Sequence, residues 1–157
     1  MKKIIIISIF IILIVLVSGI FIYQNALKPV KTAEKKAVQI AMEETELTKA
    51  EDFYLYNGQE TYYVLKGKNK KGINMYVWIP EKEGRIIVRK QSDGASEKEA
   101  VSKLLEEKKP KEIISVRLGI EDNRPLWEIY YRSEGNLINY YYVDFETGEW
   151  RKSIENL

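Results

Sequence analysis

Hydrophobic residues are concentrated in one unbroken run near the start of the chain. The run reads IIIISIFIILIVLVSGIFIY from Ile4 to Tyr23 and contains no charged residue. A helix of this length rises about 30 Å, which matches the hydrocarbon thickness of a bilayer. Because such a helix is apolar on every side, the run predicts a transmembrane segment rather than a helix of a soluble core.

A cleaved signal peptide is the alternative for this run. Its apolar region would span about 7–15 residues and would end before a small-residue cleavage site. Here the run is longer, its small-residue stretch Val17–Gly19 lies inside it, and the absence of cysteine excludes a lipoprotein anchor. Lysines flank the run on both sides, so charge alone does not set the orientation. We expect residues 1–3 in the cytoplasm, an uncleaved signal anchor over 4–23, and an extracytoplasmic remainder.

Beyond the anchor, polar and apolar positions repeat once. The segment KKAVQIAMEE from Lys35 matches KEAVSKLLEE from Lys98 with a shift of 63, and GINMYVWI from Gly72 matches LINYYYVD from Leu137 with a shift of 65. The agreement of order and spacing favours two copies of one unit over chance similarity. We expect the first unit over residues 24–92 and the second over 93–157.

Each unit is predicted to begin with a helix. In the second unit, Ser96 and Glu99 form a capping-box pattern, and Pro110 follows the helix end. The residues spaced for its apolar stripe are Ala100, Val101, Leu104 and Leu105, and those of the first unit are Ala33, Ala37, Ile40 and Ala41. Pro29 predicts a kink or a break between the first helix and the membrane segment.

Strand-like runs follow each helix, separated by glycine- and asparagine-rich turns. They begin at Asp52, Thr61, Ile73 and Arg85 in the first unit, and at Glu112, Pro125, Ile138 and Glu149 in the second. A helix followed by an antiparallel meander predicts an α+β unit whose helix covers one face of the sheet. The fold class is therefore α+β: a transmembrane helix followed by two small units in tandem.

Alternation along the strands predicts a second, aromatic sheet face. Ile73, Met75, Val77 and Ile79 should face the helix in the first unit, as should the matching Ile138, Tyr140 and Tyr142 in the second. Leu65 shares the opposite face with five aromatic residues, which are the candidate surface: Tyr63, Tyr76, Trp78, Tyr130 and Tyr141. This face either packs the two units together, binds a partner, or carries scattered surface aromatics.

The residue types exclude several chemistries. The chain has no histidine and no cysteine, which removes the common catalytic triads, thiol chemistry and the usual zinc sites. We expect no cofactor, no metal and no catalytic residue. Asp144 and Glu146 could form a glycosidase pair but fit a solvated strand end better, and the Glu121–Asn123 stretch lacks the spacing of a calcium loop. Beyond the span, 23 basic residues balance 23 acidic ones, which disfavours a nucleic-acid partner.

The apolar start MKKIIIISIFIILIVLVSGIFIY, the paired KKAV/KEAV helices, the paired INMYVWI/INYYYVDF strands and the tail YVDFETGEW resemble the TseB (YpmB) family of Gram-positive bacteria. This resemblance covers essentially the whole chain and implies tandem PepSY-like or cystatin-like units. It also implies a non-catalytic regulator of cell-wall elongation in the cell membrane, whose partner is an elongation transpeptidase of the penicillin-binding protein class. A binding or inhibitory module for an exported protease or a small envelope ligand is the alternative, and a small hydrolase is the third reading.

Overall fold

The N-terminal helix of the computed structural model is longer than the sequence pattern predicts. The structure describes residues 2–157, with side chains from residue 11 onward, and Met1 of the predicted cytoplasmic start lies outside the described residues. Helix α1 runs without interruption from Lys2–Glu44 and includes Pro29. A break at Pro29 is therefore wrong. Proline removes one backbone hydrogen bond, but its fixed φ fits a helix, and helix-forming segments on both sides carry α1 through it.

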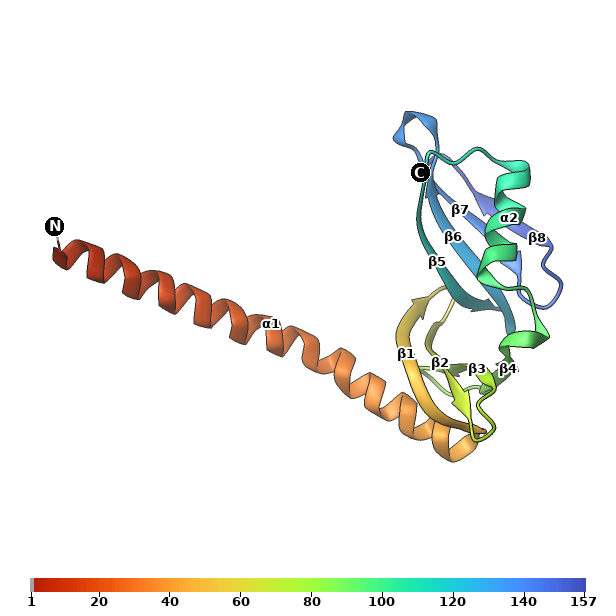
Figure 1. The fold of residues 1–157 in the computed structure, drawn as a ribbon, viewed down its shortest axis with the longest axis horizontal. Coiled ribbons are helices and arrows are strands. Elements are labelled where there is room, and N and C mark those ends of the chain that lie inside the picture. The colour runs from red at the N-terminus through yellow and green to blue at the C-terminus, as the bar shows by residue number, and fades with distance from the viewer. Residues whose placement is uncertain (1) are drawn as a thin grey trace. The chain divides into compact units, whose positions relative to one another are not determined.

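Two antiparallel sheets follow α1 (Figure 1). The first sheet has the order β1-β2-β3-β4, and the second has the order β5-β6-β7-β8. The strands of the first sheet are β1 Leu47–Asn57, β2 Thr61–Asn69, β3 Asn74–Pro80 and β4 Ile87–Lys90. The strands of the second sheet are β5 Glu112–Glu121, β6 Arg124–Arg132, β7 Ile138–Asp144 and β8 Trp150–Ile154. The predicted α+β class with two meanders is confirmed.

Helix α2, Glu97–Glu107, lies against the second sheet between two short connections (Figure 1). It is preceded by the 3-10 turn η1, Gln91–Asp93, and a second such turn, η2 Glu134–Asn136, links β6 to β7. The predicted capping box is present: the Ser96 hydroxyl accepts from the Glu99 backbone N–H at 3.2 Å, and the Glu99 carboxylate accepts from the Ser96 N–H at 2.7 Å. The box satisfies backbone donors at the helix start.

Two clusters of buried hydrophobic residues hold the helices and the sheets together. The smaller one joins the C-terminal turns of α1 to one face of the first sheet, and its buried members are Ala37, Ala41, Leu47, Leu65, Met75, Val77 and Ile79. The larger one joins α2 to the second sheet and also includes the opposite face of the first sheet. As predicted, Met75, Val77 and Ile79 face the helix, whereas Ile73 precedes β3 and is exposed.

The strand register shows that the repeat differs by one residue from the predicted shift. Residue Lys66 pairs with Tyr76, and Tyr130 pairs with Tyr140; every other pair of β2 and β3 likewise has its counterpart 64 residues later in β6 and β7. Neighbouring strand residues point to opposite faces, so the predicted shift of 65 assigns the residues of β7 to the wrong face of the second sheet. Tyr140 and Tyr142 therefore face away from α2, and Tyr141 faces it.

Residues Ala37–Leu157 form one compact unit, which contains the last turns of α1 and both sheets. The predicted boundary between the two repeats at residues 92 and 93 falls in η1 and stays a prediction. Helix repeats, in contrast, follow the predicted shift of 63: Ala37 and Ala41 are buried in the first copy, as are Ala100 and Leu104 in the second. Leu105, which the sequence predicts in the same stripe, is 54% exposed because it lies at the outer side of α2.

The stripe of α2 can be tested by a matched pair of substitutions. Leu104 is fully buried, so Leu104→Ala should lower the free energy of unfolding by about 2–5 kcal/mol through lost burial and the cavity left behind. The control Leu105→Ala should change it by less than about 0.5 kcal/mol. Urea denaturation of the detergent-solubilised chain, followed by tryptophan fluorescence, measures both. Equal midpoints for the two variants would contradict the packing described here.

Candidate interaction surface

A cluster of aromatic rings joins the first sheet to the second half of the chain. Tyr76 meets Trp127 at 6.4 Å and Phe145 at 5.9 Å between ring centroids, both edge to face, and Trp78 meets Phe145 at 6.1 Å. All four side chains are buried. Edge-to-face pairs of this kind add to the stabilisation that burial of their large surfaces provides. The first sheet's aromatic face is therefore used to pack the two sheets together.

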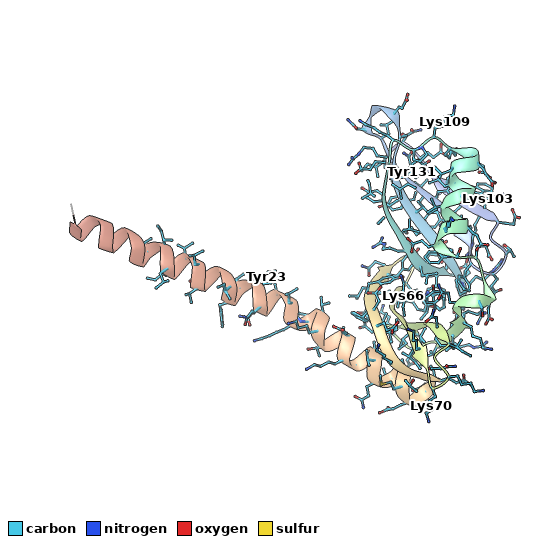
Figure 2. The ribbon with its side chains drawn as sticks, viewed as in Figure 1. Tyr23, Lys66, Lys70, Lys103, Lys109 and Tyr131 are labelled. Atoms are coloured by element: carbon cyan, nitrogen blue, oxygen red, sulfur yellow. The ribbon has the colours of Figure 1, made fainter. Side chains whose placement is uncertain are left out.

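Hydrogen bonds from β1 to β5 reinforce this junction. The Tyr54 hydroxyl accepts from the Leu118 backbone N–H at 2.9 Å and donates to the Leu118 carbonyl at 3.0 Å. Lys66, labelled in Figure 2, lies 5.7 Å from the centre of the Tyr54 ring. Burial raises the pKa of Tyr54 above its ordinary value, so the hydroxyl stays protonated and keeps both bonds even at alkaline pH.

Tyr56 extends the junction onto the face of the second sheet that is turned away from α2. Its hydroxyl donates to the Glu128 carboxylate at 3.3 Å, and Glu128 also accepts from Arg117 at 2.6 Å. A Cβ at Gly119 would lie 2.3 Å from the Tyr56 ring, so this close approach requires glycine. Burial, followed by the nearby Glu128 charge, raises the pKa of Tyr56. The Tyr56 ring thus covers one end of that face.

The other end of this face carries three tyrosines in a row. Tyr130 and Tyr140 stack at 4.9 Å, and Tyr140 and Tyr142 lie 6.4 Å apart with nearly parallel rings. The Lys152 ammonium lies 4.6 Å from the centre of the Tyr142 ring. Tyr130 and Tyr140 are partly exposed, whereas Tyr142 is buried. We call the part of the face formed by Arg117, Tyr130, Tyr140, Tyr142 and Lys152 the open face.

The two carboxylates considered for glycoside chemistry are engaged in structure. Asp144 is buried; one of its oxygens accepts from the backbone N–H groups of Glu146 and Thr147 at 3.0 Å, and the other accepts from Arg124 at 2.8 Å. Glu146 is exposed and accepts from Arg89 at 2.7 Å. Asp144 is therefore not a solvated strand-end residue: it fixes the turn between β7 and β8.

The Glu121–Asn123 stretch forms a tight hairpin turn between β5 and β6. Asp122 and Asn123 have φ values of 50° and 58°, as both central residues of a type I′ turn do. Glu121 accepts from Lys152 at 2.8 Å. Among the residues that the structure describes, no group of three or more acidic, histidine or cysteine side chains could hold a metal ion.

Comparisons with known proteins agree with this arrangement. Residues 36–80 match the model described as the cell wall elongation regulator TseB-like domain, and residues 94–153 match the peptidase propeptide and YPEB domain. The probable cell wall elongation regulator TseB of Bacillus subtilis (strain 168) is 34% identical over 143 residues, which cover 90% of this chain and 89% of that protein. The chain belongs to the TseB family.

A solved structure of a family member shares the fold. The YpmB protein from Bacillus subtilis is similar with a TM-score of 0.73 and 34% sequence identity, over 77% of this chain and 95% of that one. The resemblance to the TseB family drawn from the sequence is thereby confirmed, as is the presence of a PepSY-type domain in the second half of the chain.

The five aromatic residues predicted to form one surface lie in different places. Tyr76 and Trp78 are buried between the sheets, and Tyr141 is buried on the α2 side, where burial and then the nearby Glu107 raise its pKa. Tyr63 packs against the cluster of α1, with its ring 6.1 Å from that of Phe53, and Tyr130 belongs to the open face. The one-residue error in the repeat accounts for Tyr141. Tyr63 shares a face of β2 with Leu65, as predicted, but this face points toward α1 and not away from it.

Sequence reasoning missed the residues that make the junction and the open face. The sequence pattern gives Tyr54 and Tyr56 no role, and it predicts that Tyr140 and Tyr142 face the helix. The alignment of TYYVLK with PLWEIY at a shift of 64 contains the missing signal. Applied to β3 and β7, this shift matches Val77 with Tyr141 and Tyr76 with Tyr140, which assigns the faces of the second sheet correctly.

Because these aromatic residues differ in burial, their substitution should lower the free energy of unfolding by different amounts. Tyr76→Ala with Trp78→Ala should lower the free energy of unfolding by at least about 3 kcal/mol, because each removes a buried aromatic ring from the junction. Tyr130→Ser with Tyr140→Ser should cost about 1 kcal/mol or less per residue, because these rings are partly exposed. Urea denaturation of the full chain compares them, and an equal or larger loss in the second variant would refute the placement.

Substitutions of Asp144 and of Glu146 should also differ in how much they lower the stability of the fold. Asp144→Asn keeps one oxygen that can accept from the two backbone N–H groups, but it replaces the oxygen that faces Arg124 by an NH2 donor and removes the ion pair, and should cost about 1–3 kcal/mol. Glu146→Gln breaks an exposed ion pair and should cost less than about 1 kcal/mol. Thermal melts at neutral pH measure both. A melt of the Asp144→Asn variant that coincides with that of the unmodified chain would show that the ion pair with Arg124 does not stabilise the fold.

Proposed function

We propose that the chain is a non-catalytic, membrane-anchored, extracytoplasmic regulator of cell-wall elongation that acts by binding a penicillin-binding transpeptidase. The observation that carries the proposal is the 34% identity to the probable regulator TseB over nine-tenths of the chain. This coverage includes both sheets and extends beyond any single motif. A role through protein contacts also fits the chemistry of the described side chains, whose buried carboxylates are engaged in ion pairs and turns.

The membrane anchor is supported by α1. In the described part of the chain, α1 is long and apolar enough to cross a bilayer, and its large apolar side chains from Ile11 to Tyr23 are at least half exposed. Apolar exposure of this extent would be costly in water and is favourable in lipid. Residues 4–23 are therefore the proposed transmembrane segment, with the following chain outside the cell.

The anchor can be tested by fractionation and by protease access. The full-length chain should stay in salt-washed membranes, and trypsin added to intact protoplasts should degrade residues 37–157 at their many lysines. A cytoplasmic protein of the same cells is the control for protoplast integrity. Release of a mature form lacking residues 1–22 would show cleavage, and protection of the C-terminal part would reverse the orientation.

The transpeptidase partner can be tested by reciprocal co-purification after cross-linking in membranes. A tagged full-length chain should recover the elongation transpeptidase, and the tagged transpeptidase should recover the chain. The control keeps residues 1–36 and replaces residues 37–157 by an unrelated exported domain, which leaves the anchor intact. Recovery of the transpeptidase at no more than the level found with this control would contradict the proposal.

A PepSY-type inhibitory module for an exported protease is the second candidate, favoured by the propeptide-domain match of residues 94–153. It predicts that the full-length chain slows an exported protease of the same bacterium at stoichiometric concentration. Protease kinetics with and without the chain distinguish the two functions, because the transpeptidase reading predicts no inhibition.

A further inference from the structure

We propose that the open face is the docking surface for a protein partner whose contact region is charge-neutral and carries apolar side chains with hydrogen-bonding groups. The identification of that partner as a transpeptidase rests on the proposed function, whereas the assignment of the surface does not. Four independent features of the open face lead to this proposal.

The first feature is its equivalence to a face that already receives a folded domain. The pairs Lys66–Tyr76 and Val64–Trp78 of the first sheet correspond to Tyr130–Tyr140 and Glu128–Tyr142 of the second, 64 residues later. In the first sheet, this face is buried against the second half of the chain. The same face of the same repeated sheet is thus used for docking in one copy and is left uncovered around Tyr130 and Tyr140 in the other.

The second feature is that the tyrosine row is held in place before any partner binds. Cross-strand stacking fixes Tyr130 against Tyr140, stacking along β7 fixes Tyr140 against Tyr142, and Lys152 covers the end of the row. Tyrosine has few rotatable bonds, a large apolar ring and a hydroxyl, and it is enriched where binding energy concentrates. A row that is already ordered loses little side-chain entropy on binding.

The third feature is charge balance. Four basic side chains on this side of the second sheet each pair with a carboxylate: Arg117 with Glu128, Arg124 with Asp144, Arg132 with Glu112, and Lys152 with Glu121. A polyanion such as an acidic wall polymer would have to compete with these carboxylates for each of the four basic side chains. A neutral protein surface needs no such exchange, and paired arginines still offer hydrogen bonds at an interface rim.

The fourth feature is continuity with the junction between the sheets. Tyr56 covers Gly119 and bonds to Glu128, and the tyrosine row begins beside Glu128 at its cross-strand neighbour Tyr142, which is buried, and becomes partly exposed at Tyr140 and Tyr130. Part of the face is therefore already a contact between folded elements with tyrosine at its centre. A partner that binds beside Tyr56 would extend this contact over Tyr140 and Tyr130.

A binding measurement tests the open face directly. The full-length chain and the purified full-length elongation transpeptidase are combined in detergent micelles, and their affinity is measured. Tyr130→Ser with Tyr140→Ser should weaken binding about ten-fold or more. The control Leu105→Ser alters an exposed apolar residue on α2 and should leave affinity within about two-fold. Thermal melts of both variants establish that they fold, and unchanged affinity in the tyrosine variant would overturn the proposal.

A second experiment tests the docking surface independently of the partner's identity as a transpeptidase. A photo-reactive phenylalanine analogue replaces Tyr130 or, as the control, Leu105 in the full-length chain in living cells. Position 130 should give one protein adduct, identified by mass spectrometry, that position 105 does not give and that Tyr140→Ser removes. If that protein is not a transpeptidase, the face is supported and the proposed function fails. No adduct, an adduct of two copies of this chain, or attachment to a wall polymer alone would overturn the docking face.

Discussion

The packing of Tyr76 and Trp78 against Trp127 and Phe145 is the interaction on which the remaining arrangement depends. Without it, the first sheet would expose an aromatic face, and the two copies of the repeat would be separate modules that each have a small core. With it, one hydrophobic cluster extends from the first sheet through the second to α2. A larger continuous core buries more surface per residue, which suits a chain without disulfides.

This docking makes the two copies inequivalent, although their central strands have the same register. One copy uses its helix-distal face internally, and the other leaves part of that face exposed, around Tyr130 and Tyr140. The replacement of Val64 by Glu128 at equivalent positions follows the difference: the covered face is mostly apolar and aromatic, whereas the open one combines tyrosines with paired charges. A surface that must remain soluble until a partner binds needs this mixture. The proposed docking surface thus rests on an asymmetric use of two similar sheets.

The sequence is sufficient for the element order, the capping box at Ser96, the helix repeat and the α+β class, because these depend on local spacing and turn chemistry. The faces of the second sheet are not predictable from the Ile-Asn-x-Tyr match alone. A one-residue shift preserves a strand but exchanges its two faces, so Tyr140 and Tyr141 trade environments. The burial of Asp144 depends on Arg124, which is distant in the sequence, and the partner of Tyr54 is a backbone group of another sheet.

The central claim is that the two sheets form one cooperative body through their aromatic junction. Differential scanning calorimetry of the full-length chain in detergent tests it most directly. The account predicts a single transition for residues 37–157, with equal calorimetric and van't Hoff enthalpies. In the Tyr76→Ala and Trp78→Ala double variant, that transition should move to lower temperature or split in two. Two separate transitions in the unmodified chain would contradict the account, because the sheets would then unfold as independent modules.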